Sequence, residues 1–223
     1  MERRAYIPQE TARRLSLYLR MLRRLRQEKV RIVSSDQIRR FLNVSSVQFR
    51  KDLSYFGEFG KRGVGYDVEL LAKEIGKILG TDVLHEIILV GVGRLGSALL
   101  EYPGFLEFNL KISEAFDRNT RKVGKVCGGV RIRHMRALRQ VIKKRNLRIA
   151  VLSVPVEFAQ EVAEELVSCG IKAILNFAPV NLVLEGDVFV SNADMASELE
   201  SLVYKLKQKN KNYSLTKKRS IVI

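Results

Sequence analysis

The sequence predicts an α/β protein in which a small helical domain is followed by a doubly wound parallel sheet. Apolar residues recur every three to four positions before residue 57, which is typical of amphipathic helices. After residue 85, short apolar stretches alternate with helical patterns, which is typical of βαβ units. The length of 223 residues allows one or two domains.

Positive charge is concentrated at the two ends of the chain. Residues 1–66 carry 16 basic and 6 acidic side chains, whereas residues 67–204 carry 17 and 18. Residues 205–223 carry 7 basic side chains and no acidic ones, and the formal net charge of the whole chain is +16. The basic N-terminal part therefore indicates a polyanionic partner such as a nucleic acid.

The composition excludes several classes of protein. A hydrophobic share of 46% excludes a chain that is disordered throughout, and no apolar run approaches the ~20 residues of a membrane span. The first residues lack the apolar core of a signal peptide, so we expect a cytoplasmic protein without a membrane partner. Cys127 and Cys169 lie in no metal-site spacing, so we expect two reduced thiols, with a redox-active pair as the alternative.

The basic N-terminal part has the pattern of a winged helix-turn-helix domain. Leucines at spacings of three and four predict a helix over residues 8–28, and a serine followed three positions later by glutamine begins two more helices, at Ser34 and Ser45. Residues 57–66 contain four glycines and predict a β-hairpin. Three helices followed by such a wing, and closed by a helix over residues 67–80, predict this DNA-binding fold.

The third helix and the wing supply the candidate DNA contacts. Glutamine can read adenine and arginine or lysine can read guanine in the major groove, while the start of a helix suits a phosphate. An arginine at the wing tip can enter a narrow minor groove. The candidate DNA-binding residues are Ser45, Ser46, Gln48, Arg50, Lys51, Ser54, Tyr55, Lys61 and Arg62. The alternative is a solvated charged face.

The rest of the chain alternates strands and helices, which predicts a parallel sheet covered on both faces. The expected strands are residues 86–91, 110–116, 130–133, 148–154, 172–178 and 187–190, and the expected helices are residues 94–102, 134–145, 157–168 and 193–208.

A glycine-rich turn after the first of these strands predicts a Rossmann-type dinucleotide site. The six residues that fit G-x-G-x-x-G are Gly91, Val92, Gly93, Arg94, Leu95 and Gly96. The glycines permit a tight turn, the approach of a pyrophosphate and close packing of helix on strand. Asp117 ends the next strand, where a carboxylate binds a ribose diol and favours NAD over NADP, although Arg118 and Arg121 lie nearby. The alternative is a glycine turn needed only for packing.

Candidate catalytic groups are scarce. His85 and His134 are the only histidines, and neither is expected at the carboxyl ends of the strands, where chemistry occurs in such sheets. The sequence also offers no acid–base pair or metal-ligand cluster. We therefore expect a protein that senses its cofactor, not an enzyme.

Five segments resemble the Rex family of redox-sensing transcriptional repressors, and the resemblance extends over about residues 7–208. They are residues 50–57 (RKDLSYFG), 60–66 (GKRGVGY), 91–96 (GVGRLG), 101–105 (EYPGF) and 176–180 (NFAPV). The resemblance implies a homodimer that represses genes when the NADH/NAD⁺ ratio is low and leaves an inverted-repeat operator when NADH binds.

The family pattern also implies a domain organisation. The expected parts are a winged-helix DNA-binding domain at residues 1–80, a Rossmann NAD(H)-binding domain at 84–195 and a C-terminal domain-swapped dimerisation helix at 196–209. The basic tail at 210–223 extends beyond the family pattern, and its polar, aperiodic composition predicts disorder.

The resemblance further implies roles for individual residues. Tyr102 would lie near the nicotinamide, together with residues that end two strands, namely Ser153, Val154, Pro155, Asn176, Phe177, Ala178 and Pro179. Asp194 would pair with Tyr102 across the dimer in the NADH form and with Arg14 in the DNA-competent form. Two rival hypotheses remain: an NAD-dependent dehydrogenase with an accessory domain, and a regulator that binds CoA or another nucleotide.

Overall fold

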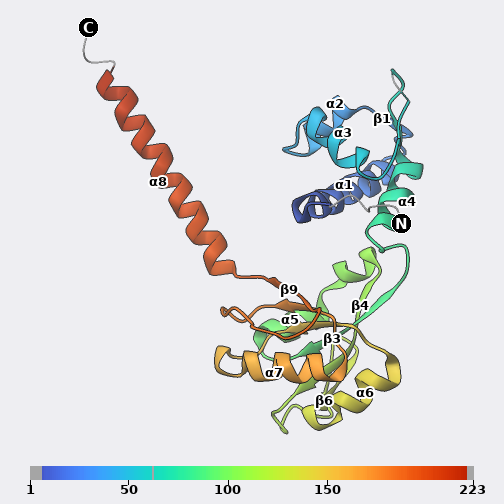
Figure 1. Ribbon diagram of the computed structural model, residues 1–223, viewed down its shortest axis with the longest axis vertical. Helices are drawn as coiled ribbons and strands as arrows, with labels where there is room; N and C mark the ends of the chain where they lie inside the picture. The colour runs from blue at the N-terminus through green and yellow to red at the C-terminus, as the bar shows by residue number, and fades with distance from the viewer. Residues whose placement is uncertain (1–6, 62, 220–223) are drawn as a thin grey trace. The chain divides into compact units, whose positions relative to one another are not determined.

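The computed structural model describes residues 7–61 and 63–219 (Figure 1). The chain divides after His85 into two compact units, which we call the N-terminal unit and the C-terminal unit.

Four helices form the N-terminal unit: α1 (Gln9–Gln27), α2 (Ser35–Phe41), α3 (Ser46–Ser54) and α4 (Val68–Ile78). The side chains of Ser34 and Ser45 each accept a hydrogen bond from the backbone N–H three residues later, which stabilises the starts of α2 and α3 as the sequence predicts. The core contains Tyr18 of α1 and Phe49 of α3, whose rings meet edge to face at 4.8 Å. All four predicted helices are confirmed to within about two residues.

The wing is built differently from the predicted hairpin. Among the described residues of the segment 57–66, only a single bridge joins Lys61 to Gly65, and strand β2 (Tyr66–Asp67) pairs instead with β1 (Ile32–Val33), which precedes α2. A Cβ at Gly65 would lie 2.8 Å from the carbonyl oxygen of Val33, so only glycine permits this close approach. Because β1 has two residues, its pattern is too short to be recognised in the sequence.

The C-terminal unit contains a seven-stranded sheet with the order β5-β6-β4-β3-β7-β8-β9. The strands are β3 (His85–Val90), β4 (Leu110–Asp117), β5 (Val126–Cys127), β6 (Val130–His134), β7 (Ile149–Leu152), β8 (Ala173–Asn176) and β9 (Phe189–Asn192). The pairs β4–β6, β3–β7, β7–β8 and β8–β9 are parallel, whereas β5 is antiparallel to β6. The six predicted strands are present, and the two-residue β5 was not predicted.

Apolar side chains cover both faces of this sheet. Along β3, Ile88 and Val90 belong to one buried cluster, which includes residues of α6 (Leu138–Arg145) and α7 (Val156–Cys169). Ile87 and Leu89 belong to a second cluster on the other face, with residues of α5 (Arg94–Glu101) and the 3₁₀ helix η1 (Pro103–Phe108). A short 3₁₀ helix, η2 (Met135–Ala137), precedes α6. This two-sided burial confirms the doubly wound sheet.

The final helix, α8 (Met195–Arg219), is longer than the sequence interpretation allows. We expected the helix to end at residue 209 and a disordered tail to follow, but the backbone is helical to Arg219. Residues 195–219 contain no glycine or proline, so nothing local ends the helix. The side chains of residues 195–209 are all exposed, and residues 220–223 lie outside the described residues. Within residues 7–61 and 63–219, no helix is long and apolar enough to cross a membrane.

Candidate functional site

The glycine-rich turn between β3 and α5 is shaped by close backbone contacts. Gly91 has a φ of +95°, and a Cβ there would lie 2.4 Å from the carbonyl oxygen of Ser153. A Cβ at Gly96 would lie 2.1 Å from the carbonyl oxygen of Gly91. At Gly93, by contrast, a Cβ would meet no atom within 4 Å. The first and third glycines therefore allow packing, while the second leaves open space where a pyrophosphate can approach the start of α5.

Asp117 at the end of β4 is tied to this turn. Its Oδ2 accepts hydrogen bonds from the backbone N–H of Val92 and from Nζ of Lys122, both at 2.9 Å, and its Oδ1 accepts one from the N–H of Asn119. Burial would raise the pKa of Asp117, but these three donors outweigh it, so the pKa lies below its usual value. The carboxylate is thus ionised near neutral pH and can also accept hydrogen bonds from a diol.

A pocket of about 230 Å³ lies beside Asp117 and the turn. Predicted residues that line it are Gly91, Gly93, Asp117, Ser153, Val154 and Pro155. Six lining residues were not predicted as contacts: Val90, Arg118, Lys122, Met135, Phe158 and Val162. The guanidinium of Arg118 lies 4.0 Å from the centre of the Phe158 ring, an arrangement that sequence spacing cannot reveal because 40 positions separate the two residues.

The other predicted cofactor contacts lie outside this pocket. Asn176 is fully buried, and its side chain binds the backbone of Ala178, so it holds the turn that also contains Phe177 and Pro179. Tyr102 is 56% exposed, and its ring packs edge to face on Phe105. Arg94 is exposed and Leu95 is half-buried in the first turn of α5.

The predicted switch residues occupy defined positions in the two units. Oδ1 of Asp194 accepts hydrogen bonds from the backbone N–H groups of Ala196 and Ser197, and so caps the start of α8. Arg14 of α1 forms an ion pair with Asp52 of α3, at 2.6 Å between Nε and Oδ2. The pairing of Asp194 with Tyr102 or Arg14 remains a prediction.

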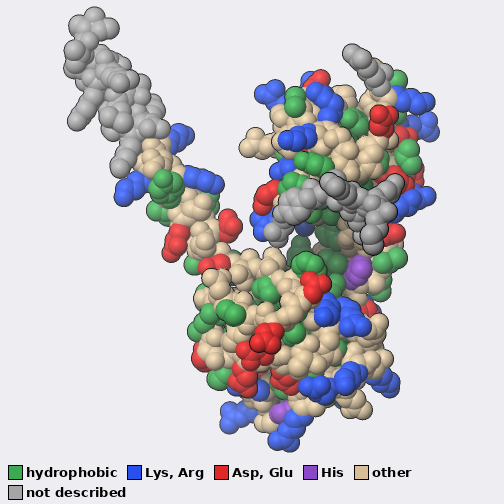
Figure 2. All heavy atoms as spheres, viewed as in Figure 1, with side chains coloured by type: hydrophobic (Ala, Val, Ile, Leu, Met, Phe, Trp, Pro, Cys, Tyr) green, Lys and Arg blue, Asp and Glu red, His purple; other side chains and the backbone are tan. Residues whose placement is uncertain are grey.

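The residues predicted to contact DNA lie on α3 and the wing of the N-terminal unit. Arg50, Lys51 and Lys61 are exposed, and blue side chains are common on this unit in Figure 2. Ser45 caps α3, half-buried Ser46 begins it, and the hydroxyl of Ser54 donates to the carbonyl of Lys51. Tyr55 is half-buried, and Arg62 lies outside the described residues.

A cleft of about 560 Å³ lies between the wing, the start of α2 and Arg50 of α3. Arg50 and Lys61 line it, together with Ser34, Ser35 and Tyr66, which were not predicted as contacts. Nη1 of Arg50 donates to the hydroxyl of Ser35 at 2.8 Å, so the guanidinium is oriented in the cleft. A basic cleft of this kind suits a nucleic-acid phosphate.

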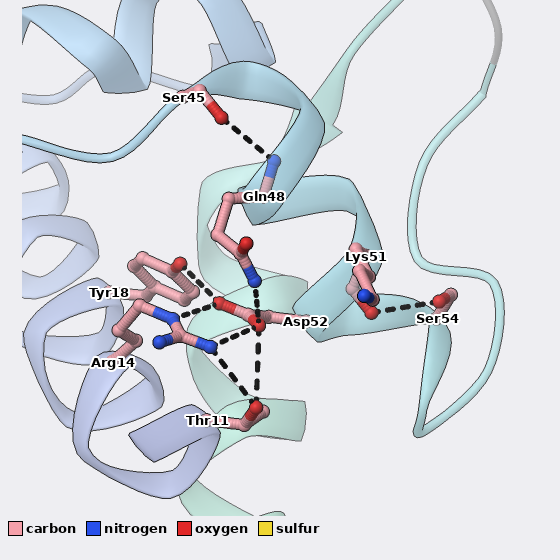
Figure 3. Close-up of polar contacts among 8 residues, drawn as sticks. All are labelled: Thr11, Arg14, Tyr18, Ser45, Gln48, Lys51, Asp52 and Ser54. Atoms are coloured by element: carbon pink, nitrogen blue, oxygen red, sulfur yellow. Dashed lines mark hydrogen bonds and ion pairs between the residues drawn. The ribbon is translucent and has the colours of Figure 1, made fainter. Parts of the chain in front are cut away.

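Gln48 is the predicted contact that differs most from expectation. Its side chain is half-buried, and its Nε2 donates to Oδ1 of Asp52 at 2.8 Å (Figure 3). We predicted that Gln48 reads a base directly, whereas here its amide nitrogen is engaged inside the unit. Asp52 itself was not predicted as a functional residue, although it lies four positions after Gln48, the spacing at which side chains on a helix meet.

Two family models match the chain, one described as "CoA binding domain" over residues 82–180 and one described as "Putative DNA-binding protein N-terminus" over residues 6–54. The redox-sensing transcriptional repressor Rex of Syntrophomonas wolfei is 45% identical over 205 residues, which cover 92% of this chain and 98% of that protein. The Rex repressor of Desulforamulus reducens is 42% identical with the same coverage. The chain belongs to the Rex family of redox-sensing transcriptional repressors.

Solved structures of another Rex-family repressor, RSP, have the same fold. RSP in complex with β-NAD⁺ and operator DNA matches with a TM-score of 0.88 at 32% identity, over 95% of this chain and 98% of that one. RSP in complex with β-NADH matches with a TM-score of 0.84 at 31% identity, over 95% and 99%. These matches confirm the predicted α/β Rex architecture of a DNA-binding domain and a Rossmann-type domain.

Across residues 7–61 and 63–219, the structure contains no group of three or more histidine, cysteine, aspartate or glutamate side chains that could hold an ion.

Proposed function

We propose that this chain is a DNA-binding transcriptional repressor that senses the NADH/NAD⁺ ratio. It binds operator DNA when NADH is low and is released when NADH binds. The observation that carries this proposal is the presence, in one chain, of a Rossmann glycine turn tied to Asp117 and of a basic winged helix. The complexes of the relative RSP with operator DNA and with NADH support it.

NAD(H) is the cofactor that the C-terminal unit fits. The open space at Gly93 admits a pyrophosphate, and the ionised Asp117 accepts hydrogen bonds from a ribose diol. The same carboxylate repels a 2′-phosphate. We assign the adenosine end of the cofactor to the pocket beside Asp117, which Ser153, Val154 and Pro155 also line, and the nicotinamide end to the residues that follow β8, with Tyr102.

The match to a model named for CoA makes CoA the second candidate ligand. CoA shares the adenosine and pyrophosphate groups with NAD(H), so the glycine turn fits both. The RSP complexes favour NAD(H).

Operator DNA is the partner that the N-terminal unit fits. Lys51 and Arg50 lie on the exposed side of α3, and Lys61 lies across the basic cleft on the wing. In helix-turn-helix dimers, two recognition helices bind half-sites about one helical turn apart, so we propose an inverted repeat.

A homodimer formed through α8 is consistent with its exposed apolar stripe. Leu199, Leu202, Val203 and Leu206 are each more than half exposed, although their spacing of three and four is that of a buried helix face (Figure 2). An exposed stripe of this kind marks an interaction surface. We propose that a second copy of the chain covers it, with α8 as the swapped helix.

The switch that we propose uses Arg14, Tyr102 and Asp194 as alternative partners across the dimer. Release of DNA requires only that the NADH-bound protein favours an arrangement in which the two α3 helices no longer match the half-sites. A shift from 99:1 to 1:99 between two arrangements needs about 5.5 kcal/mol of differential binding, which two cofactor sites can share. In this scheme the protein acts in the cytoplasm, by binding and without catalysis.

The test is a titration of NADH and NAD⁺, separately, into the complex of the full chain with an inverted-repeat duplex that the chain itself selects from a random library. We expect NADH to dissociate the complex at concentrations where NAD⁺ does not. A complex that persists in saturating NADH contradicts the switch. Competition by CoA for bound NADH, with release of DNA by CoA, would favour the second candidate ligand instead.

A further inference from the structure

The carboxylate of Asp52 is the most completely enclosed charged group of the N-terminal unit. Its side chain is 0% exposed, and it carries hydrogen bonds from Thr11, Arg14, Tyr18 and Gln48 (Figure 3). Burial would raise the pKa of Asp52, but the donors outweigh this, so the pKa lies below its usual value. A buried carboxylate that stays ionised depends on every one of its partners.

The donors come from two helices. From α1, Arg14 donates to both oxygens, with Nε at 2.6 Å from Oδ2 and Nη2 at 2.7 Å from Oδ1. Tyr18 donates to Oδ2 at 2.7 Å, and Thr11 lies 3.4 Å from Oδ1. From α3 itself, Gln48 donates to Oδ1 at 2.8 Å. The bidentate arginine pair fixes both distance and angle between α1 and α3, because its two parallel hydrogen bonds have a planar geometry.

Asp52 also links α1 to the DNA-contact face. Gln48 lies one turn before Asp52, and Lys51 is its immediate neighbour on the exposed side of α3. Arg14 and Gln48 share the same oxygen, so any displacement of Arg14 alters the position of Gln48 as well. Base readout requires side chains placed to within a fraction of an ångström, whereas phosphate contacts by long exposed lysines and arginines tolerate small shifts.

We propose that Asp52 is a positioning residue for operator recognition, through which α1 sets the orientation of α3 and the placement of Gln48. This inference rests on the proposed DNA-binding function and adds a specific claim to it. Loss of the Asp52 charge reduces discrimination between operator and unrelated DNA more than it reduces DNA binding in general.

Arg14 has two partners in these proposals: Asp52 in its own chain and Asp194 of the switch. In the arrangement that the structure shows, Arg14 is committed to Asp52 by two short hydrogen bonds. In the DNA-competent form, the proposed pairing of Arg14 with Asp194 must therefore leave both bonds to Asp52 in place, because withdrawal of Arg14 would leave a buried charge uncompensated and would free α3 from α1. Movement of Arg14 would thus change the orientation of α3 directly through Asp52, without requiring any other contact between them.

The test compares Asp52→Asn with the wild-type full chain on two duplexes, the inverted repeat selected by the wild-type protein and an unrelated duplex of equal length and composition. For Asp52→Asn we expect the affinity for the selected duplex to fall about tenfold or more, the size of effect expected when base readout is lost. Affinity for the unrelated duplex should change by less than about twofold, with an unchanged salt dependence, because exposed cations supply it. NADH affinity should not change.

Two further variants complete the test. Glu74→Gln removes a half-buried carboxylate of α4 whose hydrogen bond with Lys77 is exposed to solvent, and we expect it to leave both affinities unchanged. Tyr18→Phe removes one donor to Asp52 and keeps the ring, so it should lower the selectivity in the same direction by a smaller factor and covers the case in which Asp52→Asn does not fold.

Equal losses on both duplexes in Asp52→Asn would show a purely structural role and overturn the proposal. An unchanged selectivity in Asp52→Asn would also overturn the proposal. If Asp52→Asn does not fold, an unchanged selectivity in Tyr18→Phe would overturn it instead. If the wild-type protein selects no duplex, the proposed function itself is refuted. This outcome differs from one in which the variants keep the wild-type ratio of affinities for the selected and the unrelated duplex.

Discussion

Asp117 accepts a hydrogen bond at 2.9 Å from the backbone N–H of Val92, which lies 25 positions earlier in the chain. The acidic residue at the end of β4 and the glycine turn at the end of β3 are therefore parts of one hydrogen-bonded assembly. The carboxylate orients the turn as well as facing the pocket. A change at position 117 consequently affects both the shape of the turn and the selectivity for the ribose.

Asp117→Asn should change the preference between NADH and NADPH. The amide can still accept the hydrogen bond of Val92 through its oxygen, but it lacks the charge that repels a 2′-phosphate and pairs with Lys122. We expect NADH affinity to fall roughly tenfold, or about 1.4 kcal/mol, and NADPH affinity to fall less or to rise. Titration by the fluorescence of each reduced cofactor measures both. Glu185→Gln, an exposed change in the same unit, is the control. Equal losses for the two cofactors would contradict the assignment.

Substitutions of two glycines in the turn should have different effects, one on stability and the other on NADH binding alone. Gly96→Ala places a Cβ 2.1 Å from the carbonyl oxygen of Gly91, so we expect a loss of stability of about 2 kcal/mol or more and no NADH binding. Gly93→Ala places its Cβ in open space, so stability should stay within about 0.5 kcal/mol of wild type while NADH affinity falls. Urea unfolding and NADH titration of both variants test this. A stable Gly96→Ala, or a Gly93→Ala with wild-type affinity, would refute the reasoning.

Tyr102→Phe should uncouple NADH from DNA release. The ring packs on Phe105 and over Gly104, where a Cβ would lie 2.5 Å from the tyrosine oxygen, and phenylalanine preserves this packing. Only the hydroxyl that we propose as the partner of Asp194 is lost. We expect unchanged operator affinity and a higher NADH concentration for release, measured by the same titration as for wild type. If the variant fails to bind operator DNA, the assigned role is wrong.

The buried pair of Asp52 and Arg14 should give the N-terminal unit a sensitivity to acid. The folded-state pKa of Asp52 lies below its ordinary value of 3.8. Its contribution to stability is therefore complete above that value and is lost as the pH falls through the lower folded-state pKa. Urea unfolding of the full chain between neutral pH and about pH 3 should show a steeper acid loss for wild type than for Asp52→Asn. Glu74→Gln, at an exposed pair, should follow the wild-type curve. Parallel curves for wild type and Asp52→Asn would exclude this contribution.

The apolar stripe of α8 should control association. Leu202→Asp places a charge in the stripe, and we expect it to shift the protein from dimer to monomer in analytical ultracentrifugation. Ser201→Asp introduces the same charge on the same helix. Because Ser201 lies about 100° around the helix from Leu202, outside the stripe, the dimer should persist. A dimeric Leu202→Asp would show that other surfaces hold the copies together.

Periodicity and capping patterns predicted most of the fold. The serine–glutamine pairs at Ser34 and Ser45 predicted the starts of α2 and α3, because a cap is a local interaction that the sequence shows directly. The glycine turn and Asp117 were predicted for the same reason: their spacing is part of a compact βαβ unit. The two-residue strands β1 and β5 were missed, since they depend on distant partners and carry no period of their own.

The features of the candidate sites that could not be predicted are contacts between residues far apart in the sequence. Asp52 appeared within a family-like segment, but its ion pair joins residues 38 positions apart, and no spacing rule connects them. Arg118 on Phe158 and Ser35 with Arg50 are contacts of the same kind. The extent of α8 was underestimated because a basic, polar composition was interpreted as a tail, although it contains no residue that breaks a helix.

The crowding at Gly91 and Gly96 has a consequence for redox sensing. A turn in which one glycine abuts Ser153 and the other abuts Gly91 has little freedom to change shape, so it is ordered before any ligand arrives. The oxidised and reduced cofactors carry identical pyrophosphates and adenosines, and a rigid cradle holds these groups equally well in both. Equal affinity shifts no equilibrium. The information about redox state must therefore be read at the opposite end of the cofactor, where the two forms differ in charge and in the planarity of one ring.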